Sequence, residues 1–340
     1  MTRRESLFLF CAPLLNADER RRPAMPPITH PVLFGTEEAD RILSSLQVFP
    51  PENPWNQDVS TKPVARDSDR IITSIGASKH LGYNLDMNFV IVPPDQKRVP
   101  VKLLEFPNQS DPGPYPVPDN APIENWPLAV NEDKTALAKP GQPLEDIQRH
   151  GQGDRHLLIV DPVNGKLYEF WQARRTDSGW QASNEATFDL RTGALRPEGW
   201  TSSDAAGLPI FPASVRYDEC ERGLVEHAMR FTVRRSRRGY VHPATHFASR
   251  YENPEFPRMG ERLRLRASFD TSGFPLHARA ILEGLKKYGM FMTDNGSDWL
   301  MSISPDRRLK GLETLQKVKG SDFEVVDTGE REFIAPRPKS

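Results

Sequence analysis

Ionisable side chains are concentrated between residues 199 and 249, where acidic groups, histidines and arginines alternate with short apolar segments. Charged groups are costly to bury unless they are paired, so their density here predicts a polar cleft. A glycosidase needs two carboxyl groups, one protonated and one ionised, roughly 5–9 Å apart across a sugar bond. The residues predicted to supply this acid and base are Asp204, Asp218, Glu219 and Asp294.

The same acids also suit structural roles. Asp204, in T-S-S-D-A-A-G, is typical of a helix N-terminus, and Asp294, in D-N-G, is typical of a turn. The sequence leaves both interpretations open, because it does not show which acids face a common cleft.

Other polar side chains in this region are predicted to assist. His227 precedes a predicted strand and is expected to move a proton near neutral pH. Arg216 and Arg230 are expected to position the substrate. Glu169 and Trp171, on a strand elsewhere in the chain, are expected to bind it.

A second mechanism uses a different set of residues. Tyr240 and His242 follow an arginine-rich run, 234–238, that would neutralise an anionic polymer. This set predicts a polysaccharide lyase as the alternative enzyme. His242 and His246 have i, i+4 spacing, but Pro243 and strand-like flanks argue against a metal site, so neither a metal nor another cofactor is predicted.

Tryptophans give the third interpretation. Trp171 and Trp299 are expected to stack on sugar rings, although most tryptophans in a protein of 340 residues belong to the core. A strip of such rings without catalytic acids predicts a non-catalytic carbohydrate-binding or cell-envelope protein.

Composition limits the partners. The formal net charge of −1 favours neither nucleic acid nor a membrane surface, and no apolar run approaches the roughly 20 residues that span a bilayer. The predicted partner is therefore a polysaccharide or oligosaccharide. The sequence leaves the oligomeric state open.

The elements that must position these residues are short strands separated by turns, because 32 prolines disfavour a helical bundle. A hairpin is predicted from His156–Asp161 and Lys166–Trp171 around Asn164-Gly165. Asn88–Pro93 and Val99–Phe106 are predicted to pair as neighbouring strands. Further strands are predicted at Gly179–Ala182, Ala186–Leu190, Met229–Val233, Leu263–Ala267 and Met290–Thr293. Helices are predicted at Glu37–Leu46, Asp67–Ser78 and Leu276–Tyr288.

This pattern predicts a mainly β protein with a few covering helices, of the α+β class, as a β-sandwich or jelly-roll-like single domain. The N-terminus has basic residues before a short apolar run, which predicts a signal segment at residues 1–17 and a secreted or periplasmic protein. Residues 18–45 are expected to form a linker with a weak helix, 46–333 the β-rich domain and 334–340 a frayed tail.

Several long segments resemble a broad family of exported bacterial proteins to which no activity is assigned. They read N-P-W-N-Q-D-V-S, D-P-G-P-Y-P-V-P, G-D-R-H-L-L-I-V-D, F-D-L-R-T-G, W-T-S-S-D-A-A-G-L-P, E-H-A-M-R-F-T-V and Y-G-M-F-M-T-D-N-G-S-D-W. The resemblance covers about Val48 to Asp327 and implies export and one domain. It transfers no catalytic residue. The leading prediction is an exported glycoside hydrolase that uses a pair of carboxyl groups.

Overall fold

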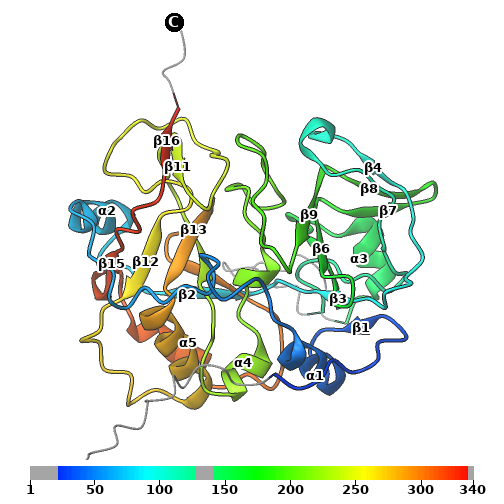
Figure 1. Cartoon of the computed structure of the whole chain (residues 1–340), viewed down its shortest axis with the longest axis horizontal. Helices are drawn as coiled ribbons and strands as arrows, with labels where there is room; N and C mark the ends of the chain where they lie inside the picture. The colour runs from blue at the N-terminus through cyan, green and yellow to red at the C-terminus, as the bar shows by residue number, and fades with distance from the viewer. Residues whose placement is uncertain (1–21, 128–140, 336–340) are drawn as a thin grey trace, which may run out of the picture.

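The computed structural model describes residues 22–127 and 141–335. It is a mixed structure of mostly sheets with few helices, with 19% of residues helical and 24% in strands, as the α+β prediction requires. Two sheets form the two halves seen in Figure 1. The predicted signal segment, 1–17, and the end of the predicted tail, 336–340, lie outside the described residues.

The first sheet has five strands, and the predicted hairpin is at its centre. In spatial order the strands are β1 (Val32–Leu33), β3 (Val90–Ile91), β5 (Leu157–Asp161), β6 (Lys166–Trp171) and β9 (Asn184–Asp189). The turn spans residues 162–165 and ends with Asn164-Gly165, where Gly165 has a φ of 67°, a conformation that suits glycine. Alternation along β6 buries Leu167 against the second sheet and Tyr168 on the opposite face.

The second sheet has six strands of mixed direction. In spatial order these are β15 (Phe323–Val325), β12 (Arg262–Leu265), β13 (Met290–Asn295), β10 (Met229–Val233), β14 (Leu300–Ile303) and β2 (Gly82–Leu85). β10 and β13 are parallel, so their C-terminal ends lie together. One apolar core joins residues of both sheets.

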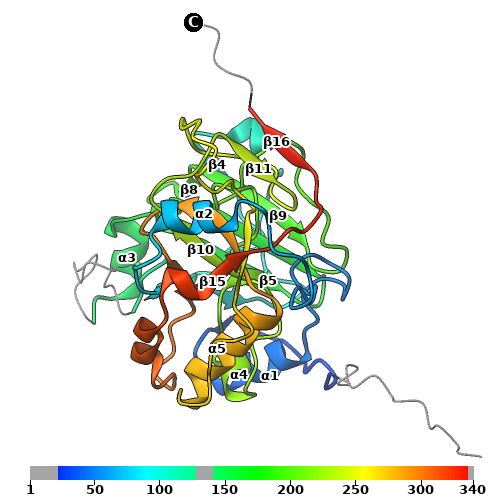
Figure 2. The same ribbon diagram turned by 90° about the vertical axis from the view of Figure 1, so that its left-hand side faces the viewer.

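Smaller elements complete the fold. Two small sheets contain β11 (Gly239–Val241) with β16 (Glu332–Ile334), and β4 (Val101–Leu103), β8 (Gly179–Ala182) and β7 (Arg174–Thr176). The α-helices are α1 (Glu37–Ser45), α2 (Ser68–Ile75), α3 (Leu144–His150), α4 (Tyr217–Glu221) and α5 (Leu276–Lys287). Short 3-10 helices occupy Pro107–Gln109, Phe211–Ala213, Leu312–Lys317 and Gly320–Asp322. Figure 2 shows α1, α4 and α5 at one end of the molecule and β11 with β16 at the other.

Two local expectations change. β3 and β4 do not pair with each other, so that prediction is wrong: β3 joins β1 and β5, whereas β4 joins β8 in a separate small sheet. Apolar alternation identified both strands but carries no information on their partners. The folded body also extends upstream of Val48, because Ile28 and Ile42 are buried in the main core.

None of the helices in the described ranges is long and apolar enough to cross a membrane.

Candidate active site

A pocket of about 310 Å³ lies where β6, β9 and β13 bring their ends together. Trp171 ends β6, Asn184 begins β9, and Asp294 lies at the end of β13. Because side chains alternate along β6, Glu169 and Trp171 face the second sheet. The pocket therefore collects side chains from both sheets, which are far apart in the sequence.

Two carboxyl groups line this pocket. Asp154 is exposed, and the Trp171 Nε1–H lies 3.5 Å from its Oδ1. Asp294 is partly buried, and its Oδ1 accepts from the backbone N–H of Asn295 at 2.6 Å. Burial and the nearby charge of Asp204 raise the pKa of Asp294 to about 7. One carboxyl group of the pair thus keeps its proton well above the usual range, as a catalytic acid requires.

His246 adds a basic group to the same pocket. Its Nδ1 donates to the carbonyl oxygen of Ala205 at 2.7 Å, which places the single proton of the neutral ring on Nδ1. Burial lowers the pKa of His246 and favours this neutral form. Within the described part of the chain Nε2 forms no hydrogen bond, so its lone pair is available to a ligand.

Strained backbone holds the first carboxyl group and its tryptophan. Arg155 and Gln172 have φ of 57° and 55°, in the left-handed region, and each directly follows Asp154 or Trp171. The Gln172 N–H donates to the Asp154 carbonyl at 2.9 Å, which ties the two segments together. The buried Arg155 guanidinium donates to three carbonyls, including that of Ala173. Such strain persists only where the surroundings enforce it, and it is frequent at functional sites.

A buried ion pair lies next to Asp294. Arg230 donates to both carboxylate oxygens of Asp204 at 2.9 Å and to the hydroxyl of Ser302. Asp204 is fully buried, and its backbone N–H donates to the Ser202 hydroxyl at 2.9 Å. The paired carboxylate is therefore fixed in position, and its charge disfavours ionisation of Asp294.

A second buried pair extends this network. His156 Nδ1 donates to Glu124 at 2.9 Å, and its Nε2 donates to the Ser203 carbonyl at 2.9 Å. Burial acts to lower the pKa of His156, but the Glu124 charge outweighs it and raises the pKa to about 10. His156 is therefore a buried cation at neutral pH.

Within the described ranges, two further carboxyl groups pair with no cation of their own. Burial and the Glu124 charge raise the pKa of Asp86 to about 7, and its Oδ1 has no hydrogen-bond partner among the described residues. Burial raises the pKa of Glu169 to about 7, although it accepts from the Ile210 and Phe211 N–H groups.

Charge balance explains these shifts. The five carboxyl groups of the network, which are Asp86, Glu124, Glu169, Asp204 and Asp294, share two cations, Arg230 and His156. Two carboxylates balance the two cations, and the remaining three are those whose pKa rises to about 7. Protonation thus avoids an uncompensated buried negative charge.

Four other predicted residues form a separate cluster at α4. Glu219 accepts from Arg216 at 2.5 Å and from His227 at 3.1 Å, and Asp218 accepts from Arg222 at 2.7 Å. His227 precedes β10 at its start, whereas the pocket lies at the other end of the parallel strands, about 16 Å away at 3.3 Å per residue. These acids therefore do not meet Asp294.

The remaining predicted residues lie elsewhere. Tyr240 and His242 both bind Glu198, with His242 Nε2 at 2.6 Å from its carboxylate, near β11. Trp299 is fully buried and stacks between Phe231 and Phe323, with ring centroids 5.9 and 5.2 Å away. A tryptophan in this position fills the core of the second sheet and does not line the pocket of Asp294.

Two of the residues predicted from the sequence, Asp294 and Trp171, line this pocket. Asp154 and His246 also line it, but the sequence does not predict a catalytic role for either. Asp154 stands in G-D-R-H before a strand, which marks a strand entry but not a partner across the sheet. The i, i+4 spacing of His246 from His242 suggests only a metal ligand, and nothing in the local sequence points to a base. Among the described residues, no three His, Cys, Asp or Glu side chains form a group that could hold a metal ion.

Comparisons of the chain with family models, with curated proteins and with solved structures give no match. The resemblance to an exported bacterial family therefore stays a prediction, and the function must be argued from the site.

Proposed function

We propose that the protein is a glycoside hydrolase that acts on an oligosaccharide or polysaccharide. The observation that supports this most is the pocket with a protonated Asp294, a second carboxyl group on Asp154 and the ring of Trp171. An indole ring that stacks on a sugar, together with a protonated Asp294 and a second carboxyl group, meets the chemical needs of glycosidic hydrolysis.

The two carboxyl groups take different parts. Asp294 gives its proton to the glycosidic oxygen as the bond to the anomeric carbon breaks, and Asp154 attacks that carbon directly or removes a proton from the attacking water. The hydroxyl group of Ser203 and the amide of Asn184 also line the pocket and suit the hydroxyl groups of a sugar. The configuration of the first product distinguishes the two routes for Asp154.

Hydrolysis fits the pocket better than elimination. A lyase needs a cation to neutralise the uronate carboxylate, and no arginine or lysine is among the described residues that line the pocket. Arg230 is satisfied by Asp204 and Ser302. His246, rather than Tyr240 or His242, is the base nearest to a substrate in this pocket. The export of the protein is part of the proposal and rests on the N-terminal sequence.

The test is a screen of the full chain against neutral and uronic-acid polysaccharides, with reducing ends and unsaturated uronate absorbance recorded together. Reducing ends alone are expected, and they should fall by at least ~10²-fold in Asp294→Asn and Asp154→Asn. The control is Asp95→Asn, an exposed turn residue away from the pocket. Unsaturated product would instead favour elimination, and tight sugar binding without turnover would favour the non-catalytic interpretation.

A further inference from the structure

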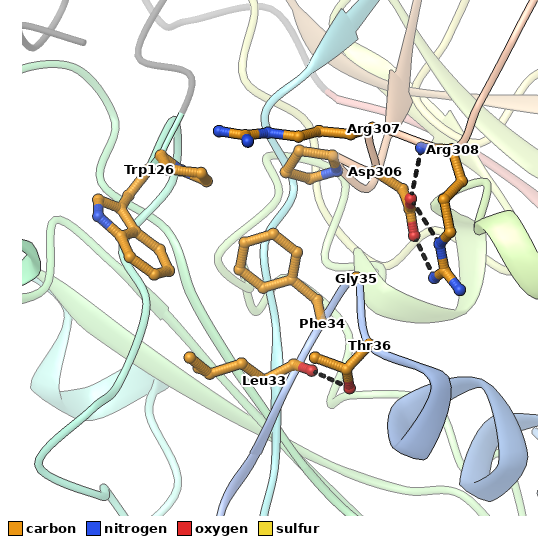
Figure 3. Close-up of a pocket in the computed structure, with 10 residues that line it drawn as sticks. Leu33, Phe34, Gly35, Thr36, Trp126, Asp306, Arg307 and Arg308 are labelled. Atoms are coloured by element: carbon orange, nitrogen blue, oxygen red, sulfur yellow. Dashed lines mark hydrogen bonds and ion pairs between the residues drawn. The ribbon is translucent and has the colours of Figure 1, made fainter. Parts of the chain in front are cut away.

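A second pocket, of about 280 Å³, lies between β1, residues 126–127 and residues 305–308 (Figure 3). Its walls are mainly apolar. The rings of Phe34 and Trp126 lie 6.1 Å apart at 88°, and Phe34 is backed by Phe89 at 6.1 Å. Two rings at right angles form a corner that can contact a flat ring on its face and on its edge.

The tryptophan of this corner is held firmly. The preceding residue, Asn125, has φ of 71°, an uncommon conformation for a residue other than glycine. The Trp126 N–H donates to the Ile123 carbonyl at 3.0 Å, and the Asn88 side chain donates to the carbonyls of Ile123 and Trp126. The pocket wall is therefore formed in advance, which lowers the entropic cost of binding.

The two arginines of this pocket differ in their partners. Arg308 is neutralised, since it donates to Asp306 at 2.9 and 2.6 Å and to Asp40 at 2.6 Å. Arg307 is exposed and forms no side-chain hydrogen bond or ion pair within the described part of the chain. Figure 3 shows its side chain extended across the pocket toward Trp126. Among the described residues, one guanidinium of the pocket thus has no partner, and it lies above an aromatic corner.

We propose that this pocket binds an aromatic carboxylate, with the ring in the corner of Phe34 and Trp126 and the carboxylate on Arg307. A guanidinium binds a carboxylate through two parallel hydrogen bonds, and it is the cation best suited to this role. The volume is just below the roughly 300–1,000 Å³ typical of ligand sites, so a single ring with one acid group fits. The mainly apolar walls offer few of the hydrogen bonds that a sugar needs.

Calorimetric titration of the full chain with benzoate tests this, with benzyl alcohol as the neutral probe of similar shape. Benzoate is expected to bind, and Arg307→Gln is expected to weaken it by about tenfold or more without changing the binding of benzyl alcohol. The matched control is Arg41→Gln, an exposed arginine on α1 outside the pocket. Trp126→Leu should weaken both probes, with the melting temperature checked in each variant.

Three results would overturn the proposal. Benzoate does not bind, Arg307→Gln leaves its affinity unchanged, or Arg41→Gln lowers that affinity equally, as non-specific charge attraction would. Each result leaves the glycoside hydrolase proposal intact, because its residues lie in the other pocket.

Discussion

At the scale of single residues, the neighbours of Asp294 determine the pH at which it loses its proton. Burial and the fixed charge of Asp204 hold its pKa at about 7, so the acid form is lost as the pH rises through that value. We therefore expect kcat/KM to fall above about pH 7 in the free enzyme. A pH–rate profile on the substrate found in the screen measures this, and a rate that stays constant to high pH would remove Asp294 as the acid.

The cluster at α4 is expected to act on stability. Glu219 is buried and accepts hydrogen bonds from Arg216 and His227. Burial opposes its ionisation, but the Arg216 charge and the contact with His227 lower the pKa of Glu219 to about 2. Glu219→Gln leaves the buried Arg216 guanidinium without its carboxylate partner, which costs about 3–5 kcal/mol of unfolding free energy. Urea denaturation measures the loss, and kcat of the folded variant should be unchanged. If Glu219→Gln instead lost much of its kcat at unchanged stability, the catalytic site would lie at α4.

At the scale of elements, the turn between α5 and β13 determines where Asp294 lies. Gly289 has φ of 67°, and a Cβ there would lie 2.2 Å from the Leu263 carbonyl oxygen. Gly289→Ala is expected to lower the unfolding free energy by about 3 kcal/mol or more, since a left-handed backbone costs about 1–2 kcal/mol and overpacking a further ~1–3.

The control for this prediction is Gly199→Ala. Gly199 has φ of 82°, but no atom lies within 4 Å of its added Cβ. Only the backbone cost of about 1–2 kcal/mol applies there. Equal losses in the two variants, measured by urea denaturation, would show that the contact with Leu263 has no effect.

At the scale of the whole molecule, the network between the sheets makes stability depend on pH. Asp86, Glu169 and Asp294 ionise near pH 4 when unfolded but hold their protons to about pH 7 when folded. Their contribution to the unfolding free energy is complete below about pH 4, and it is lost as the pH rises to about 7. His156, with its pKa raised from 6.5 to about 10, extends the decline to higher pH.

We expect the unfolding free energy to fall between about pH 5 and 7, by up to ~1.4 kcal/mol per pH unit for each proton. The lowered pKa of Glu219 acts in the opposite direction, but only below about pH 4.5. Glu169→Gln should make the unfolding free energy fall less steeply with pH, by the ~1.4 kcal/mol per pH unit that one proton contributes. Urea denaturation across this pH range measures both slopes, and a stability that rises with pH would contradict the proposed charge balance.

Much of the local structure follows from the sequence. Asn164-Gly165 between two apolar segments determines the hairpin of β5 and β6, and apolar spacing ending at Gly289 determines α5. These predictions succeed because turn conformation and helical spacing depend on neighbouring residues. The α+β class follows from the same signals, whereas the sandwich form stays a prediction.

The sequence also determined that carboxyl groups, arginines and tryptophans are present in number, but only the tertiary structure decided which of them meet. Asp204, Arg230 and Asp294 share one network because β10 and β13 pair in parallel, whereas Asp218 and Glu219 lie at the opposite end of those strands. Asp154 lies beside Trp171 because β5 and β6 pair as a hairpin, and it shares a pocket with Asp294 only because the two sheets pack together. Strand pairing between distant segments depends on packing of the whole core, which no local pattern of residues encodes.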